Sequence, residues 1–177
     1  MKWSASQALH LTYCVSTAFG GNYSKVVSAM SSATGAWEAS ARVNFVHASA
    51  QDSNCTGRNS AVVFDVNPVN TTQYLARAFF PNSSRRSRNI LIAQDSFGDI
   101  SPWTLTGILR HELGHTLGFR HEHTRVSSTV CYEDNAWRAL TPYDASSVMH
   151  YPQCRGTNKG DLSLTTSDKQ GAGILYP

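Results

Sequence analysis

Residues 111–121 read HELGHTLGFRH, and this stretch governs how the rest of the chain is interpreted. A step of four residues along a helix turns about 40° beyond one revolution, so His111 and His115 leave the same face. Both imidazoles can therefore bind one metal ion. Glu112 lies one position from His111, which lets it reach a water on that ion while it points beside the ligands.

The same stretch supplies a third ligand beyond the end of the helix. Gly118 can adopt the left-handed conformation that ends a helix and sends His121 back toward the ion bound by His111 and His115. HExxH alone arises by chance in about 2% of chains of this length, and two further fixed positions lower that chance about 400-fold. Three imidazoles and one open position are typical of a catalytic zinc site, because a structural site normally has four protein ligands. We therefore predict one catalytic Zn²⁺ on these three histidines, with Glu112 as general acid and base.

The stretch ends a helix that we expect over residues 99–118. Its markers are Asp99 or Ser101 as N-cap, Pro102 near the first turn and Gly118 at the C-cap. These signals make it the most clearly delimited helix of the chain.

The rest of the sequence predicts a sheet with a helix behind it. Five segments rich in β-branched and aromatic residues predict strands, at residues 8–16, 41–49, 61–69, 74–81 and 89–97. Apolar residues at helical spacing predict helices over residues 24–41 and 166–174. The segment 74–81 ends in proline before a polar loop, which favours an edge strand whose free backbone groups can pair with an extended peptide. We therefore expect an α+β fold.

Composition limits the class of protein. A chain of 177 residues with 41% hydrophobic and 15% charged residues predicts one globular domain, and no run of about 18 apolar residues could span a membrane. We expect a soluble protein without a membrane partner. The net charge of +3 is too small to favour nucleic acid. We interpret the basic residues Arg85, Arg86 and Arg88 as a solvated loop, with attraction of substrate as the alternative.

The four cysteines, Cys14, Cys55, Cys131 and Cys154, have no CxxC spacing, so we predict disulfides and an oxidising, extracellular location. A thiol that inhibits by binding zinc is the alternative. Residues 1–11 contain no apolar core of a signal peptide. We therefore expect Met1 to be an artificial start or the point where a leader and pro-segment were removed.

The string HELGHTLGFRH, followed by SVMHY at residues 147–151, resembles the metzincin metallopeptidases, which pair a long zinc motif with a methionine turn. The F-R-H-E-H and M-H-Y runs are most similar to astacins and to small bacterial relatives of the dual-action HEIGH type. Matrix metalloproteinases lack a tyrosine two positions after the methionine. The resemblance implies that Met149 supports the zinc from below. It also implies that Tyr151 is a detachable fifth ligand whose hydroxyl stabilises an oxyanion.

The resemblance also implies an architecture of one catalytic domain over residues 1–177. An upper subdomain, residues 1–118, contains a twisted, five-stranded mixed sheet, and a loop-rich lower subdomain covers residues 119–177. Cys131 and Cys154 bracket the methionine turn, so a bridge between them would tie the lower subdomain and leave Cys14 to pair with Cys55.

Several substrate contacts follow from the same resemblance. In the family the edge strand binds the substrate, so the resemblance assigns substrate binding to Arg77, Ala78 and Phe79. Arg155 and Lys159 follow the methionine turn, so we expect a preference for acidic P1′ residues.

Two features remain: the histidines outside the ligand set, and the start of the chain. We assign His123 and His150 structural or substrate-side roles. In astacins a buried N-terminus pairs with the glutamate that corresponds to Glu122, and the start Met1-Lys2 does not support that pairing.

These observations predict a secreted, monomeric zinc endopeptidase that acts on proteins or peptides. The alternative from another class is a secreted zinc-containing binding or toxin-like module with little peptidase activity, for which the edge strand is a docking surface. Chelator-sensitive cleavage of an unfolded protein distinguishes the two.

Overall fold

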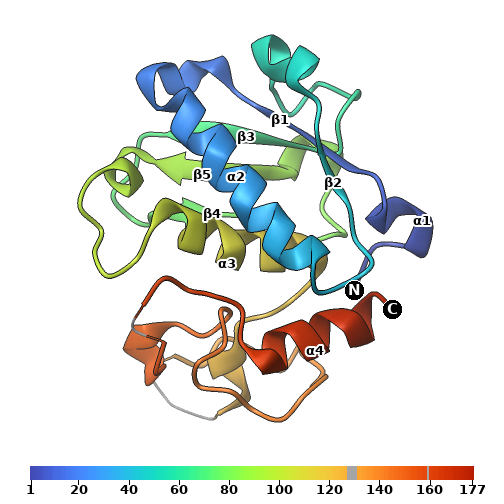
Figure 1. Ribbon diagram of the computed structural model, residues 1–177, viewed down its shortest axis with the longest axis vertical. Coiled ribbons are helices and arrows are strands. Elements are labelled where there is room, and N and C mark those ends of the chain that lie inside the picture. The colour runs from blue at the N-terminus through green and yellow to red at the C-terminus, as the bar shows by residue number, and fades with distance from the viewer. Residues whose placement is uncertain (127–130, 159) are drawn as a thin grey trace.

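The computed structural model describes residues 1–126, 131–158 and 160–177 (Figure 1). Its sheet has five strands in the order β2-β1-β3-β5-β4. They are β1 (Leu11–Val15), β2 (Phe45–His47), β3 (Phe64–Val69), β4 (Ala76–Arg77) and β5 (Asn89–Ala93). Neighbouring strands run parallel except β4, which is antiparallel to β5. The predicted α+β fold with a mixed sheet is confirmed, and β4 forms one edge.

Helices cover the sheet and continue below it. Within the described ranges the α-helices are α1 (Ala5–Ala8), α2 (Tyr23–Glu38), α3 (Leu105–Leu117) and α4 (Thr166–Leu175). Figure 1 shows α2 crossing in front of the strands, with α3 beside its C-terminal half. The indole N–H of Trp37 on α2 donates to the carbonyl of Arg110 on α3 at 2.9 Å. The backing helix thus holds the helix that carries the zinc motif.

The start of α3 differs from the prediction. Its N-cap is Thr104, whose hydroxyl accepts a hydrogen bond from the backbone N–H of Gly107 at 3.0 Å. The predicted caps, Asp99 and Ser101, lie in the preceding turn, where the N–H of Trp103 donates to the carbonyl of Ile100. A hydroxyl that can reach the third N–H of the helix satisfies a donor that would otherwise lack a partner, which places the start at Thr104.

The chain after α3 returns beneath the sheet and ends near its beginning (Figure 1). It contains the short 3-10 turns Glu122–Arg125 and Pro152–Cys154 before α4. The hydroxyl of Tyr176 donates to the carbonyl of Leu117 at 2.6 Å and accepts from the N–H of Trp3 at 3.2 Å. The division into subdomains at residue 118 remains a prediction. Among the residues described, no helix has the length and apolar character needed to cross a membrane.

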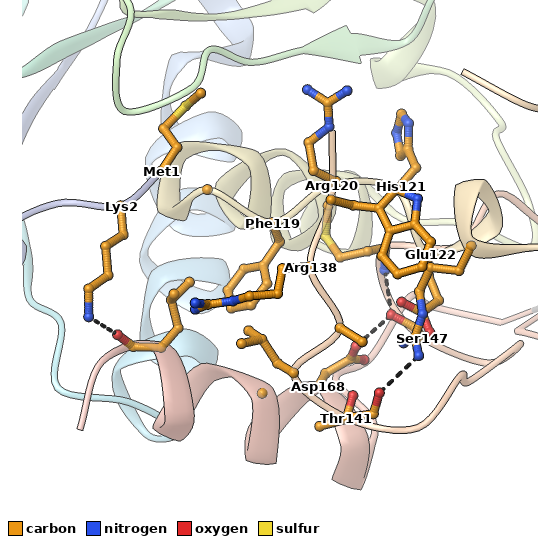
Figure 2. A pocket seen from close by; sticks show the side chains of 18 of the residues that line it. Met1, Lys2, Phe119, Arg120, His121, Glu122, Arg138, Thr141, Ser147 and Asp168 are labelled. Atoms are coloured by element: carbon orange, nitrogen blue, oxygen red, sulfur yellow. Dashed lines mark hydrogen bonds and ion pairs between the residues drawn. The ribbon is translucent and has the colours of Figure 1, made fainter. Parts of the chain in front are cut away.

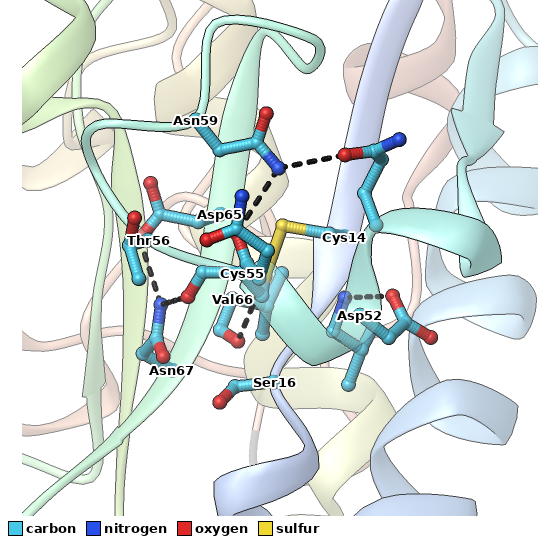
Figure 3. The surroundings of a disulfide bond; sticks show 12 residues. Cys14, Ser16, Asp52, Cys55, Thr56, Asn59, Asp65, Val66 and Asn67 are labelled. Carbon is cyan, nitrogen blue, oxygen red and sulfur yellow. Dashed lines mark hydrogen bonds between the residues drawn. A yellow bond between two sulfur atoms is a disulfide. The ribbon is translucent and has the colours of Figure 1, made fainter.

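Two disulfides hold different parts of the chain. Cys14 in β1 is bonded to Cys55, and Cys131 is bonded to Cys154, which are the pairs expected above. Figure 3 shows the first of them beside Asp65 of β3. Bonded sulfurs cannot ligate zinc, so the alternative of an inhibitory thiol does not apply.

Two arginines of the basic cluster contact other parts of the fold instead of extending into solvent. The guanidinium of Arg85 lies 2.7 Å from a carboxylate oxygen of Asp65, which is 2% exposed. Arg88 donates to the carbonyl of Ser83 and lies over the ring of Trp3. The prediction of a solvated loop is therefore wrong for these two arginines, because a buried carboxylate and an aromatic face draw them inward.

Candidate active site

Two of the predicted zinc ligands lie on α3 and the third follows it. His111 and His115 are buried on the same face of the helix. Gly118 ends the helix with a φ of 103°, a left-handed conformation that favours glycine. The chain then turns back and brings the Nε2 of His121 to 3.2 Å from that of His111 and 3.1 Å from that of His115.

The other ring nitrogen of each histidine fixes its tautomer. The Nδ1 of His111 lies 2.7 Å from the carbonyl of Val148, and that of His115 lies 2.9 Å from the carbonyl of Phe119. The Nδ1 of His121 lies 2.5 Å from a carboxylate oxygen of Glu133. A carbonyl or carboxylate only accepts, so each Nδ1 carries the proton and each Nε2 presents a lone pair.

Three converging lone pairs cannot bond to one another, and they are arranged to hold a cation between them. Nitrogens at 2.0–2.1 Å from a tetrahedral zinc lie about 3.3 Å apart, close to the separations found here. Burial lowers the pKa of His111 to about 4 and that of His115 to about 3, and it also lowers the pKa of His121. All three rings are therefore uncharged near neutral pH, and each can offer a lone pair to a metal ion. The residues thus fit Zn²⁺.

Glu112 lies on the same helix with its side chain withdrawn from water. The residue is 7% exposed, and burial raises the pKa of its carboxyl to about 8, partly opposed by the positive charge of Arg77. A carboxyl with a pKa near neutrality can accept a proton and release it again, which general acid and base catalysis requires.

Met149 and Tyr151 lie next to the histidines, in the turn at residues 147–151. The ring centroid of Tyr151 is 4.2 Å from that of His121 and 5.4 Å from that of His111. Burial, with the negative charges of Glu112 and Glu133, raises the pKa of Tyr151 to about 12, so its hydroxyl is a donor at neutral pH. Met149 packs so closely on α3 that a Cβ on Gly114 would collide with its sulfur.

The turn is anchored by a residue that the sequence did not reveal. The carboxylate of Asp168, in the first turn of α4, accepts hydrogen bonds from the hydroxyl of Ser147 at 2.5 Å and from the N–H of Val148 at 2.9 Å. It also accepts from the N–H of Thr165 as part of a capping box. The spacing T-x-x-D signals only the cap, so the contact with the turn could not be anticipated.

The predicted substrate-binding residues take different positions. Arg77 is exposed on β4, Ala78 follows it, and Arg155 is exposed after the turn Pro152–Cys154. Phe79 is 4% exposed and packs on Phe64, so its side chain belongs to the core and only its backbone could face a peptide. Lys159 lies outside the described residues.

Two further polar residues, Glu133 and His123, extend the site beyond the motif. His123 is buried and stacks on Tyr151, with ring centroids 4.9 Å apart. Glu133 contacts both His121 and His123. The position of Glu133 two residues after Cys131 was the only available signal, and it indicated no role.

A cavity of about 660 Å³ lies next to the site, and His121 is one of the residues that line it (Figure 2). Met1 and Lys2 lie at one side of it and Glu122 at the other, with α4 below. Glu122 accepts from the guanidinium of Arg125 at 2.7 Å and from the N–H of Asp144 at 2.9 Å. Glu122 corresponds to the glutamate that pairs with the N-terminus in astacins. In this chain it is paired with Arg125 and a backbone amide instead.

Comparisons with known proteins all point to metallopeptidases. Residues 2–177 match the family described as matrixin. High choriolytic enzyme 2 of Oryzias latipes is 40% identical over 63 residues, which cover 26% of this chain and 22% of that protein. The astacin-like metalloendopeptidase of Coturnix japonica is 41% identical over 69 residues, covering 29% of this chain and 17% of that protein. The matches thus span less than a quarter of these relatives.

Solved structures show the same fold over the whole chain. Myroilysin has a TM-score of 0.63 at 18% identity, with 99% of this chain and 95% of that chain covered. A hatching enzyme zinc-protease from Oryzias latipes, high choriolytic enzyme 1, has a TM-score of 0.61 at 20% identity, with 99% and 98% covered.

Proposed function

This chain belongs to the matrixin family of peptidases, and we propose that it is a secreted zinc-dependent endopeptidase that hydrolyses peptide bonds of proteins. One observation carries the proposal: three imidazole lone pairs converge beside a buried carboxyl whose pKa is raised to about 8. Two disulfides support an extracellular location.

His111, His115 and His121 would hold the zinc. When bound there, zinc lowers the pKa of a water and polarises the substrate carbonyl. Glu112 accepts the proton of the attacking water at a carboxylate oxygen and then delivers it to the leaving amine. Its raised pKa suits both transfers, because burial makes the carboxylate a stronger base than an exposed one and the bound proton can still be released to the amine.

Tyr151 and the edge strand act on the substrate itself. The phenol of Tyr151, protonated at neutral pH, donates a hydrogen bond to the carbonyl oxygen as negative charge develops on it. The free side of β4 can pair with an extended peptide, and Arg77 and the backbone of Ala78 and Phe79 would contact it. Met149 supports the histidines by packing beneath α3.

Glu112→Gln tests the proposal, because it removes the proton acceptor while leaving the three imidazoles. We expect kcat on unfolded casein to fall by about 10²- to 10⁴-fold with zinc content unchanged. Glu38→Gln is the matched control, since Glu38 accepts from the N–H of Phe45 at the start of β2 and an amide oxygen can do the same. Chelation should abolish cleavage and zinc should restore it.

Wild-type cleavage by Glu112→Gln would refute the role of Glu112. Intact casein in the presence of zinc-loaded wild-type protein would favour the binding module over the peptidase. The sites cut in the same digestion test the remaining proposal, that the exposed Arg155 selects acidic P1′ residues. The protein is proposed to act as a monomer.

A further inference from the structure

The three proposed zinc ligands are anchored in different ways. His111 and His115 lie on α3, and the Nδ1 of each donates to a backbone carbonyl. His121 lies beyond Gly118, outside the helix, and its Nδ1 faces a side chain: Oε1 of Glu133 at 2.5 Å. An imidazole on an irregular segment takes its tautomer, and part of its orientation, from such a hydrogen-bond partner.

The same carboxylate oxygen of Glu133 faces a second imidazole. It lies 3.4 Å from the Nε2 of His123, longer than a typical hydrogen bond but within ion-pair range. The Nδ1 of His123 accepts the backbone N–H of Tyr151 at 3.3 Å, so the ring proton is on Nε2 and points toward Glu133. His123 stacks on His121 and on Tyr151, with centroids 4.8 and 4.9 Å apart.

His121, His123 and Glu133 could also be read as a second metal site, because their ligand atoms lie close together. The proton positions argue against that reading. Nδ1 of His121 must carry its proton if Nε2 is to offer a lone pair, and Nε2 of His123 carries its proton because Nδ1 accepts from Tyr151. Both nitrogens present protons to Glu133, which makes the group a carboxylate that orients two imidazoles.

We propose that Glu133 is a positioning residue: it fixes the tautomer and direction of His121 as the third zinc ligand and, through His123, the backbone of Tyr151. This inference depends on the proposed zinc site. Glu133 needs no contact with substrate, since it acts through the two histidines. Carboxylates behind metal-bound histidines commonly have this effect, and their removal lowers metal affinity about 10- to 100-fold.

The test is a competition for zinc between the purified protein and a chromophoric chelator at neutral pH. Glu133→Ala should weaken zinc binding about 10- to 100-fold and speed zinc release. Glu133→Gln should fall between Glu133→Ala and wild type, because its amide oxygen still accepts from the Nδ1 of His121. In long-range ¹H–¹⁵N spectra of the zinc-loaded protein, the Nδ1 proton of His121 should be seen in wild type and lost in Glu133→Ala.

Asp134→Ala is the matched control, because it removes the neighbouring carboxylate, which pairs with Arg120. Its zinc affinity should equal that of wild type. Urea unfolding of the metal-free variants should also match wild type, which separates positioning from folding. If Glu133→Ala does not fold, the zinc affinity of Glu133→Gln decides.

Zinc affinity of Glu133→Ala within about twofold of wild type would overturn the inference, and so would an equal loss in Asp134→Ala. In either case a wild-type protein that binds zinc and cleaves casein leaves the proposed function intact. A wild-type protein that binds no zinc would overturn both.

Discussion

Residues 1–118 and residues 119–177 are held together by different interactions, although both contribute to the proposed zinc ligands. The first region contains the five-stranded sheet, two long packed helices and most of the buried apolar side chains. The described part of the second region has no strand, and its turns rest on backbone N–H groups that donate to side-chain carboxylates such as those of Glu122 and Asp168. We infer that the first region sets the stability of the fold, whereas the second sets how firmly the third ligand is held.

The largest expected effect tests the first region. Asp65→Ala leaves the guanidinium of Arg85 beside the sheet without its buried partner, which should lower the free energy of unfolding by about 3–5 kcal/mol. Zinc affinity of the folded protein should not change, because Asp65 does not contact the site. Urea unfolding and chelator competition measure the two quantities. Asp134→Ala, which breaks a partly exposed pair with Arg120, should change stability little.

The two disulfides give a matched pair of variants, one for each region. Cys14 and Cys55 are 41 residues apart and Cys131 and Cys154 are 23 apart, so loss of either crosslink should cost about 3.5–4 kcal/mol by chain entropy. Only replacement of Cys131 and Cys154 by serine should also weaken zinc binding, because Glu133 lies two residues from that crosslink. Equal zinc affinities in the two double variants would contradict the contrast between the regions.

A smaller effect is expected at the junction between α4 and the methionine turn. Asp168→Ala removes the acceptor for Ser147 and Val148 and should destabilise the protein by about 2 kcal/mol. Zinc release should become faster, since the carbonyl of Val148 anchors His111. Asp168→Asn keeps one acceptor oxygen and should show a smaller change in both measurements. Unchanged release in Asp168→Ala would show that the turn holds its position without α4.

The sequence predicted those features that depend on local spacing. HExxH on a helix and Gly118 as its end follow from helical spacing and glycine geometry, and the five strand segments follow from their β-branched and aromatic composition. Each of these features appears in the structure. The start of α3 was misplaced because Asp99, Ser101 and Thr104 are all competent caps, and only the folded chain shows which one reaches an N–H. Pro102 strengthened the wrong choice.

Contacts between distant segments could not be predicted. Glu133 approaches His121 because the segment after Cys131 meets the residues that follow α3, and Asp168 meets Val148 across 20 residues. The sequence predicts that Arg85 lies in a solvated loop, whereas in the structure Asp65 of β3 lies beside it. In each case the sequence gives the charge of the side chain, and the tertiary fold determines its partner.

The close packing of Met149 on α3 has a consequence for the zinc pentapeptide itself. The pattern HExxH leaves its third and fourth letters open, yet Leu113 is fully buried and Gly114 has no room for a side chain above the methionine sulfur. In this molecule both open letters are therefore determined by their surroundings. A designer who transplants the pentapeptide into another scaffold must bring the methionine and the bare helix surface together, as a single unit.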